Sequence, residues 1–433
     1  MRPIKVIIFA YDFPPSNSVG AQRPYSWLKH FNDFGIYPVV ITRHWDAVST
    51  ADDRIRASLS KANETLETEF GTILRVPFLP NIRDRILLKY GEQHAVIRRI
   101  LSLWYSMAQY IFASSDNRRN MLDAAREYVK KNPCDIIIAT GEPFILFHYA
   151  KILSKEFGIP WIADYRDGWS TNYHLQSTAS GLDRLINNLY FTPLEKRIVA
   201  TSALITTAAP AIRTDLCKLH PTKNAKVIFN GFFPEMFETL SKKENRTNQP
   251  FIIAYSGTLY PYQKLYIFID GFEKFVQLNA LSPSEIQIHF LGLEYQPDQM
   301  KRLLDYKPDL NKYIKITGRM PHSESLIILN QADVLLLLTN ARFGQIYAKV
   351  FDYVALGKPI LMCENDQGPL EQILNDAGTG HIADNSDQVC EQLSSLYETL
   401  PSATINAAHV QQYSRKYQAE RLANFIKSFL QNK

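Results

Sequence analysis

Short runs of apolar residues alternate with longer amphipathic stretches along the first half of the chain. The apolar runs have the length of strands in a parallel sheet that is buried on both faces. The stretches between them repeat with the period of a helix. Predicted strands cover 6–10, 39–42, 73–76, 136–140, 161–164 and 204–208, and predicted helices cover 24–34, 121–131, 144–157 and 182–201. Strands that alternate with helices predict a doubly wound, parallel α/β sheet.

The same alternation begins again after residue 250. Predicted strands cover 251–256, 286–292, 314–317, 334–338 and 359–362, and predicted helices cover 348–356 and 386–399. The polar sequence SKKENRTNQ at 241–249 separates the two patterns and is the predicted linker. We therefore predict two Rossmann-like domains, over 1–240 and 250–410, followed by a helix over 411–433 that packs back on the first domain.

Basic residues and large apolar residues are interleaved over 81–119, where the alternation of strands and helices is interrupted. This segment carries seven basic residues against three acidic ones. A basic amphipathic helix with aromatic residues such as Trp104 and Tyr105 can lie on an anionic membrane. The pattern also fits a helical insertion that packs on the first domain and keeps its arginines in water. The sequence leaves both interpretations open.

Composition and charge narrow the class of protein. With 433 residues, 46% of them hydrophobic and 21% charged, the chain is typical of a globular protein of two or three domains. The net charge of +5 is too small to indicate a nucleic-acid partner, and no nucleic-acid-binding motif is present. No apolar run reaches the roughly 18–20 residues that span a bilayer, and the run 6–10 is too short for a signal peptide.

The cysteines indicate the compartment in which the protein lies. The four cysteines are scattered without metal-binding spacing and fit reduced thiols, at positions Cys134, Cys217, Cys363 and Cys390. We expect a cytoplasmic protein, and any peripheral membrane contact would be with the inner face of the plasma membrane.

A buried strand (334–338), a turn at Gly344 and a helix (348–356) follow one another in the second domain. The free amides and the positive end of the dipole at such a helix start favour an anion, and Lys349 adds a full positive charge. Asp352 lies three residues further on, on the same face of the helix as Lys349. A cation for phosphate and a carboxylate for hydroxyl groups, about one helical turn apart, suit a nucleotide-sugar.

The first half of the chain carries YDFPPSNSVGAQRPYSWLKHF at 11–31 and GIPWIADYRDGW at 158–169. The second half carries YSGTLYPYQK at 255–264, ITGRMPHSE at 316–324 and AKVFDYVALGKPIL at 348–361. With these motifs the chain resembles glycosyltransferase family 4 over most of its length, and the three motifs of the second half follow in the order of that family. The motif at 158–169 resembles one found in a bacterial surface-polysaccharide subgroup. The resemblance implies the GT-B fold, in which two Rossmann-like domains face a central cleft.

The resemblance also implies an activity. It indicates a bacterial enzyme that moves a sugar from a UDP- or GDP-linked donor to a saccharide or lipid-linked saccharide in capsule, O-antigen or exopolysaccharide biosynthesis. Transfer would retain the anomeric configuration without a protein nucleophile, and the leaving diphosphate would help to deprotonate the acceptor. The sequence has no Asp-x-Asp motif, so we expect no metal, and no cofactor besides the nucleotide-sugar substrate.

On the donor side, the resemblance assigns residues to each part of the nucleotide-sugar. Loops after strands would bring glycine backbones to the diphosphate and to the base. The expected donor-binding set is Gly257, Thr258, Gly318, Arg319, Gly344, Gln345, Ile346, Tyr347 and Asp352. Lys264 and Lys349 would stabilise the departing diphosphate. The alternative for Lys264 is a solvated surface lysine, and the alternative for Arg319 is a surface ion pair with Glu324.

The chain departs from the Glu-x7-Glu motif of the family. Asp352 matches the second acid, which binds the ribose hydroxyls, and a solvated helix acid is the alternative. The position eight residues earlier is Gly344, and a register matched on Phe343-Gly344 places Ala341 at the first acid. Neither register supplies the first carboxylate, so the sequence does not identify the acid that orients the sugar.

On the acceptor side, Gly20 matches a family glycine that lies close to the sugar and the acceptor. Arg23 would bind an acceptor phosphate or form a surface ion pair. Asp167, a candidate catalytic residue, and Arg166 would face the acceptor or the transferred sugar, and Glu142 could join them from the end of the preceding strand. The alternative for the charged residues of 164–167 is an internal ion-pair network that holds their loop.

Two other functions fit parts of the sequence. A nucleotide-sugar epimerase with the GT-B shape would need a catalytic carboxylate and histidine set, which the sequence does not reveal. A non-catalytic protein that binds nucleotide-sugar would account for the missing first carboxylate.

Overall fold

The computed structural model describes residues 2–16, 18–46, 55–112, 115–172, 180–240, 249–340, 346–399 and 406–432. The chain divides into two compact units, one formed by 1–229 with 418–433 and the other by 230–417. Each unit has its own sheet and its own hydrophobic core.

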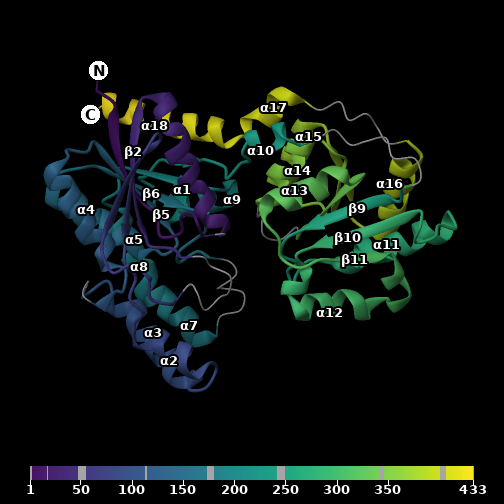
Figure 1. Cartoon of the computed structure of the whole chain (residues 1–433), viewed down its shortest axis with the longest axis horizontal. Helices are drawn as coiled ribbons and strands as arrows, with labels where there is room; N and C mark the ends of the chain where they lie inside the picture. Colours follow the sequence, from purple (N-terminus) through teal and green to yellow (C-terminus); the bar gives the residue numbers. More distant parts are fainter. Residues whose placement is uncertain are drawn as a thin grey trace. The chain divides into compact units, whose positions relative to one another are not determined.

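The first unit is built on a sheet to which the described residues contribute eight strands (Figure 1). The strands are β1 (Ile4–Phe9), β2 (Ile36–Arg43), β3 (Glu64–Thr68), β4 (Gly71–Val76), β5 (Ile136–Gly141), β6 (Trp161–Tyr165), β7 (Leu204–Thr207) and β8 (Ala225–Val227). Their order across the sheet is β3-β4-β2-β1-β5-β6-β7-β8, and neighbours run parallel except β3 and β4. The apolar pattern did not predict β3, because its sequence ETLET is mostly polar and exposed.

Helices cover both faces of this sheet. The helices of this unit are α1 (Val19–His30), α2 (Ile82–Tyr90), α3 (Ala95–Ala108), α4 (Arg119–Lys131), α5 (Ile145–Phe157), α7 (Gly181–Ile186), α8 (Thr192–Val199), α9 (Pro210–Leu219) and α18 (Arg415–Gln431). Successive side chains of a strand point to opposite faces. Val6 and Ile8 of β1 accordingly lie in the core with residues of α1 and α18, whereas Ile7 and Phe9 lie in the core with residues of α4, α5 and α8.

The ends of the chain meet in the first unit. In Figure 1 the yellow helix α18 runs beside the purple N-terminal elements. Its Ala419, Leu422, Ala423 and Ile426 are 0% exposed and belong to the same core as Val6 and Ile8 of β1. The last helix therefore contributes to the core of the first sheet.

The second unit contains a sheet to which the described residues contribute six strands, all parallel. They are β9 (Phe251–Ser256), β10 (Ile286–Leu291), β11 (Ile314–Ile316), β12 (Val334–Leu338), β13 (Ile360–Cys363) and β14 (Gly380–Ala383), in the order β11-β10-β9-β12-β13-β14. The helices are α10 (Glu235–Glu238), α11 (Leu265–Leu278), α12 (Pro297–Tyr306), α13 (His322–Gln331), α14 (Lys349–Leu356), α15 (Pro369–Ala377), α16 (Ser386–Glu398) and α17 (Ala407–Gln412).

The two sheets confirm the prediction of two parallel, doubly wound α/β sheets. In each sheet the chain leaves two neighbouring strands in opposite directions, at β1 and β5 in the first and at β9 and β12 in the second. Ligands of doubly wound sheets bind at such switch points, beside the carboxyl ends of the strands. No helix among the described residues is both long and apolar enough to cross a lipid bilayer.

Candidate functional site

Lys349 lies at the switch point of the second sheet. It is the first residue of α14, after β12, and Gly257 directly follows β9. A Cβ atom built on Gly257 would lie 3.8 Å from both Cε and Nζ of Lys349. Gly257 has a φ of +85°, which residues with a side chain rarely adopt. A glycine here thus gives the loop its conformation and keeps the backbone close to the lysine amine.

The Lys349 amine is buried and has no hydrogen-bond partner among the described residues. Loss of hydration lowers its pKa from 10.5 to about 7. The nitrogen lies 3.6 Å from the centre of the Tyr255 ring, whose face attracts a cation only weakly compared with a counter-ion. A buried cation without a counter-charge is costly, and a phosphate group would supply that charge.

Tyrosine side chains line the loops around this lysine. The rings of Tyr260 and Tyr262 stack with their centres 5.2 Å apart, and Tyr347 lies 6.2 Å from Tyr260. Burial raises the pKa of Tyr347 to about 12, so its hydroxyl stays protonated and can donate a hydrogen bond. The Tyr255 hydroxyl donates to the carbonyl of Thr258 at 2.6 Å and so fixes the loop that follows β9.

Lys264, the other expected cation, has an acidic partner in the structure. Its amine lies 2.7 Å from Oε1 of Glu364, and the two side chains are 45% and 11% exposed. Glu364 follows β13, and its Oε2 is buried without a hydrogen-bond partner among the described residues. Sequence reasoning did not find Glu364, although its position after a strand at the carboxyl edge was a signal. In this structure Glu364 therefore balances the positive charge of Lys264.

Asp352 is held by a histidine at the start of α13. Oδ2 of Asp352 and Nε2 of His322 are 2.9 Å apart. This hydrogen bond raises the pKa of His322 above 6.5, and the charge of Asp352 adds to the effect. The next residue, Tyr353, accepts a hydrogen bond from the amide of Ser256 at 2.9 Å. Helix α14 is therefore attached both to α13 and to the end of β9.

The remaining donor candidates lie further along the same edge or outside the described residues. A Cβ atom built on Gly318 would lie 3.0 Å from Oε2 of Glu294, and the guanidinium carbon of Arg319 is 5.4 Å from the centre of the Tyr295 ring. Ile346 is half-buried. The expected donor residues Gly344 and Gln345, and the first-acid position Ala341, lie outside the described residues.

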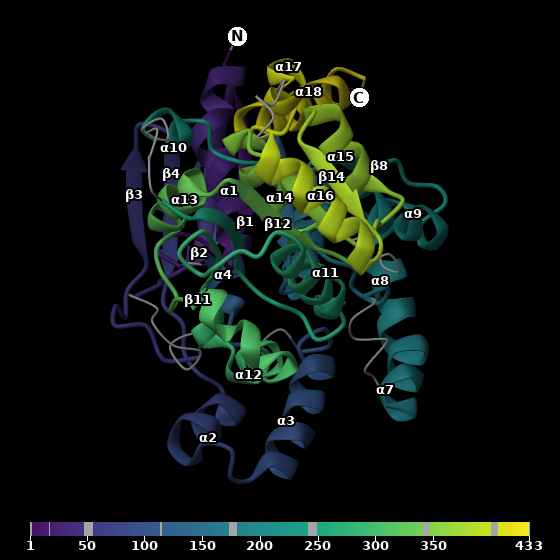
Figure 2. The ribbon, with the colours of Figure 1, turned by 90° about the vertical axis from the view of Figure 1, so that its right-hand side faces the viewer.

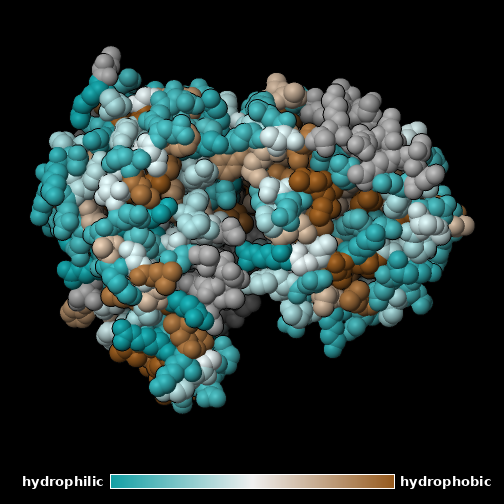
Figure 3. All heavy atoms as spheres, viewed as in Figure 1, coloured by the Kyte–Doolittle hydropathy of each residue, from teal (hydrophilic) through white to brown (hydrophobic). Residues whose placement is uncertain are grey.

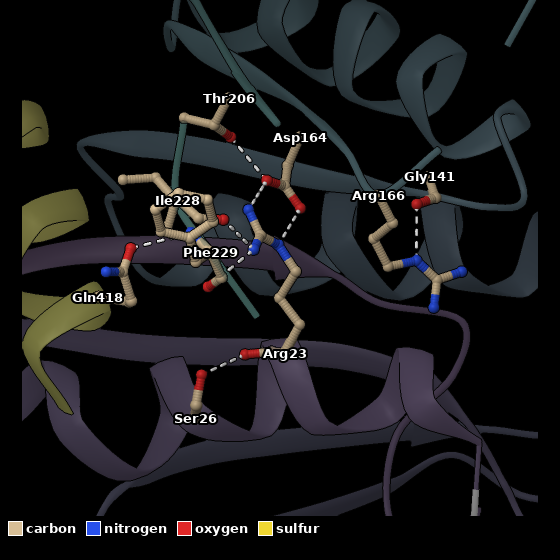
Figure 4. A network of polar contacts seen from close by, with 9 residues as sticks. All are labelled: Arg23, Ser26, Gly141, Asp164, Arg166, Thr206, Ile228, Phe229 and Gln418. Atoms are coloured by element: carbon tan, nitrogen blue, oxygen red, sulfur yellow. Dashed lines mark hydrogen bonds and ion pairs between the residues drawn. The ribbon is translucent and has the colours of Figure 1, made fainter. Parts of the chain in front are cut away.

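In the first unit, Arg23 forms a buried ion pair with Asp164 (Figure 4). Its Nε and Nη2 lie 3.0 and 2.6 Å from the two carboxylate oxygens, and Nη1 donates to the carbonyl of Ile228. Arg23 is 2% exposed and Asp164 is 0% exposed, and the Thr206 hydroxyl donates to Asp164 at 2.7 Å. Arg23 thus joins α1 to β6 inside the unit. The sequence had suggested that Arg23 binds an acceptor phosphate or forms a surface ion pair, but its guanidinium is buried in this pair and is not open to a phosphate.

Arg166 brings three of the acceptor candidates together. It donates to the carbonyl of Gly141 at 2.7 Å (Figure 4). It also donates to the carbonyl of Glu142 at 2.9 Å and lies 3.5 Å from Oδ2 of Asp12. A Cβ atom built on Gly20 would lie 1.3 Å from Nη1 of Arg166. Gly20, Glu142 and Arg166 therefore meet at the carboxyl edge of the first sheet, beside its switch point.

The buried carboxylate of Glu195 holds both ends of the loop that carries Asp167. Glu195, which is 0% exposed, accepts hydrogen bonds from the Tyr165 hydroxyl at 2.7 Å and from the Ser170 amide at 2.8 Å. Asp167 itself is exposed. Loss of hydration raises the pKa of Glu142 above 4.5, and the charge of Asp167 contributes to the shift. The loop thus holds a solvent-facing carboxylate on a buried support.

Within the described ranges, no group of three or more His, Cys, Asp or Glu side chains is arranged to hold a metal ion.

No family model and no curated protein matches the sequence. Sucrose-phosphate synthase from Thermosynechococcus elongatus is similar in structure, with a TM-score of 0.64 at 12% identity over 99% of this chain and 100% of that chain. A glycosyltransferase from Rickettsia africae has a TM-score of 0.61 at 13% identity, with 100% of both chains covered. HepE of Anabaena, in complex with UDP, has a TM-score of 0.56 at 11% identity over 98% of this chain and 100% of that chain. The chain therefore has the GT-B fold that these proteins share.

Proposed function

We propose that the protein transfers a sugar from a UDP- or GDP-linked donor to a saccharide or lipid-linked saccharide acceptor. The observation that carries the proposal is the buried amine of Lys349, which has no hydrogen-bond partner among the described residues and lies beside Gly257 at the switch point of the second sheet. The fold adds support, because HepE was solved with UDP and with UDP-glucose.

In this proposal the second unit holds the donor. The diphosphate binds Lys349 and the start of α14, and its charge keeps the lysine protonated. Asp352 accepts hydrogen bonds from the ribose hydroxyls, with His322 holding the carboxylate in place. Lys264 moves from Glu364 to the diphosphate. Gly257, Thr258, Ile346 and Tyr347 line the phosphates, and Gly318 and Arg319 lie near the base.

The chemical step breaks the bond between the anomeric carbon and the diphosphate oxygen. The acceptor hydroxyl oxygen bonds to the same face of that carbon, and its proton passes to the leaving diphosphate. Negative charge grows on the diphosphate as the bond breaks, so Lys349 and Lys264 stabilise the transition state more than the bound donor. The resemblance to family 4 supports retention and a reaction without metal.

The first unit takes the acceptor in this proposal. Gly20, Glu142 and Arg166 meet beside the switch point of its sheet, and Asp167 adds an exposed carboxylate to their edge. A carboxylate can accept hydrogen bonds from sugar hydroxyls. We assign the enzyme to surface-polysaccharide biosynthesis on the resemblance of the 158–169 segment.

Two measurements on the full chain test this proposal. Isothermal titration with UDP, GDP and ADP should show binding of one or more of these nucleotides, weakened by Lys349→Met and unchanged by Lys301→Met, a matched change of an exposed lysine on α12. Incubation with UDP- and GDP-sugars should then release the nucleoside diphosphate. Failure of all three nucleotides to bind would refute the proposal, binding without turnover would favour a non-catalytic protein, and interconversion of nucleotide-sugars would favour an epimerase.

A further inference from the structure

Helices α2, α3 and α7 lie at one end of the first unit (Figure 2). Large apolar side chains on α3 face solvent. Val96, Ile97, Ile100, Leu103 and Trp104 are between 40% and 72% exposed. Their spacing places them on one face of the helix. Of the residues of α3, Ala108 alone is buried. The helix therefore presents its apolar face outward.

A second apolar row lies on the helical segment 181–191. Leu182, Leu185 and Leu189, on α7 and the π-helical turn 187–191 that follows, are 64%, 52% and 71% exposed. They are three and four residues apart, which places them on one side of the helical segment. The hydroxyl of Tyr190 donates to the carbonyl of Met107 at 2.9 Å and links this segment to α3.

Positive charge borders the two apolar rows. Residues 82–112 include five basic and two acidic side chains, and each acid is paired with an arginine, Asp84 with Arg83 and Glu92 with Arg98. The basic residues left in excess are Arg85, Lys89 and Arg99. Lys89 and Arg99 are exposed. Figure 3 shows apolar side chains in brown next to charged ones in teal over α2 and α3. The face thus combines exposed apolar groups with a positive border.

The apolar and basic side chains of this face favour a lipid bilayer over a second copy of the chain as its binding partner. Isolated exposed apolar residues are common on proteins, but a contiguous group of this size marks an interaction surface. In a symmetric dimer built on this face, the basic borders of the two copies would meet and repel each other. A bilayer with anionic lipids offers acyl chains for the apolar rows, negative head groups for the basic residues and an interface that Trp104 and Tyr90 prefer.

We propose that the face formed by α2, α3 and α7 binds the surface of an anionic lipid bilayer. The apolar rows insert at the boundary between head groups and acyl chains, and the basic residues contact lipid phosphates. This inference stands on the exposed face alone and does not depend on the sugar-transfer activity.

Sedimentation of the full-length protein with lipid vesicles tests this inference. The protein should bind vesicles of phosphatidylcholine and phosphatidylglycerol in equal parts, bind vesicles of phosphatidylcholine alone at least about tenfold more weakly, and dissociate as salt is added. Val96→Ser with Ile100→Ser should weaken binding at least about tenfold, because two apolar side chains no longer enter the bilayer. Lys89→Gln with Arg99→Gln should weaken it about tenfold.

Matched controls separate this face from general surface effects. Leu278→Ser changes an apolar residue that is 73% exposed on α11 of the second unit, and Lys301→Gln changes an exposed lysine on α12. Both controls should bind vesicles as the wild type does. All variants should keep the wild-type melting temperature and nucleotide affinity, because the changed side chains are exposed.

Three results would overturn the inference. They are equal binding to the two kinds of vesicle, no binding to the anionic ones, and unchanged binding by the Val96→Ser, Ile100→Ser variant. A wild-type dimer in light scattering that this variant dissociates would assign the face to a second copy of the chain. Since nucleotide titration reports on the second unit separately, a failure here leaves the proposed function standing.

Discussion

At the scale of single residues, Lys349 combines burial with the lack of a hydrogen-bond partner among the described residues. Its pKa of about 7 lies below the ordinary 10.5. Between these two values the unfolded chain holds a proton that the folded protein lacks, so stability rises with pH across this window. Below about pH 7 the folded protein carries the full cost of the buried charge.

Lys349→Met should therefore stabilise the protein in the absence of nucleotide, and most strongly in acid. The gain in melting temperature should be largest at pH 6 and should shrink as the pH rises from 7 towards 10. Thermal unfolding at pH 6 and pH 9 measures it, with Lys301→Met as the control that should show no such trend. A difference between wild type and variant that does not change with pH would contradict the assignment of a buried, neutral lysine.

Asp352 should matter for nucleotide binding and, well above pH 6.5, little for folding. In the proposed function Asp352→Ala removes charge-assisted hydrogen bonds to the ribose worth roughly 2–3 kcal/mol, so nucleotide affinity should fall well over tenfold. The helix should stay in place because Tyr353 still accepts from the amide of Ser256. Titration calorimetry measures the loss, and Asp298→Ala, at an exposed aspartate in the first turn of α12, is the control.

The same substitution has a signature at His322. The bond to Asp352 raises the pKa of His322, so it stabilises the fold below about pH 6.5 and is lost as the pH rises through the folded-state pKa. In Asp352→Ala the pKa of His322 should fall, which NMR titration of the ring can follow. Unchanged nucleotide affinity together with an unchanged His322 pKa would show that Asp352 neither binds the ribose nor pairs with His322.

Single residues also show the limit of what the sequence could predict. Lys349 and Asp352 were found because their positions relative to a helix start are local properties of the chain. The partners of Lys264 and Arg23 come from other loops and strands, since Glu364 and Asp164 lie 100 and 141 residues away in the sequence. A linear pattern does not contain such pairings, so it could not distinguish a free cation from a neutralised one.

At the scale of elements, the start of α1 depends on a glycine. Gly20 lies against the Arg166 guanidinium, which is itself bonded to the carbonyls of Gly141 and Glu142. A methyl group at this position must displace the guanidinium, so Gly20→Ala should disturb the acceptor edge and lower transfer more than tenfold, a loss on the order of 1.4 kcal/mol or more. Nucleotide affinity should stay at the wild-type value.

Steady-state kinetics with calorimetry on the same preparation tests this expectation. Gly181→Ala is the matched control, because a Cβ atom there would meet nothing within 4 Å. Full transfer activity in Gly20→Ala would show that the edge around Arg166 does not handle the acceptor.

Elements were predictable where the sequence repeats with one clear period. Strands such as β9 and β12 were predicted with their observed ends, because each is an apolar run with polar or turn residues after it. The start of α1 was placed at Pro24, but the Ser18 side chain caps the helix by accepting from the Ala21 amide, so α1 begins at Val19. The single helix predicted over 182–201 is interrupted by the π-helical turn 187–191.

At the scale of the whole molecule, the C-terminal helix belongs to the core of the first unit. Leu422 of α18 is 0% exposed and packs in the same cluster as Val6 and Ile8 of β1. Leu422→Ala should lower the free energy of unfolding of the first unit by about 2–5 kcal/mol. The second unit has a separate core and should keep its nucleotide affinity.

Hydrogen exchange followed by mass spectrometry can resolve the two units. Peptides from β1, β5 and β6 should lose protection in Leu422→Ala, whereas peptides from β9 and β12 should not. Asn424→Ala, at an exposed position on the same helix, is the control. Loss of protection in both units together would show that the two cores do not unfold independently.

The overall fold was the most predictable property, because the alternation of strands and helices repeats along both halves of the chain. The candidate donor site was only partly predictable. Residues 341–345, where the first acid of the family motif would lie, are outside the described residues. Glu364, a carboxylate close to Lys264, comes from a different strand end and has no motif around it.

The central claim is that Lys349 receives the diphosphate of a nucleotide-sugar, and proton uptake on binding tests it most directly. At pH 8 the amine, with a pKa of about 7, is mostly neutral, and a bound diphosphate should restore its proton. Calorimetric titration with UDP, GDP and ADP in buffers of different ionisation enthalpy should give an uptake of about one proton for the nucleotide that binds. In Lys349→Met the uptake should vanish and the affinity should fall at least about tenfold. Equal affinity in wild type and Lys349→Met, or binding without proton uptake, would contradict the account.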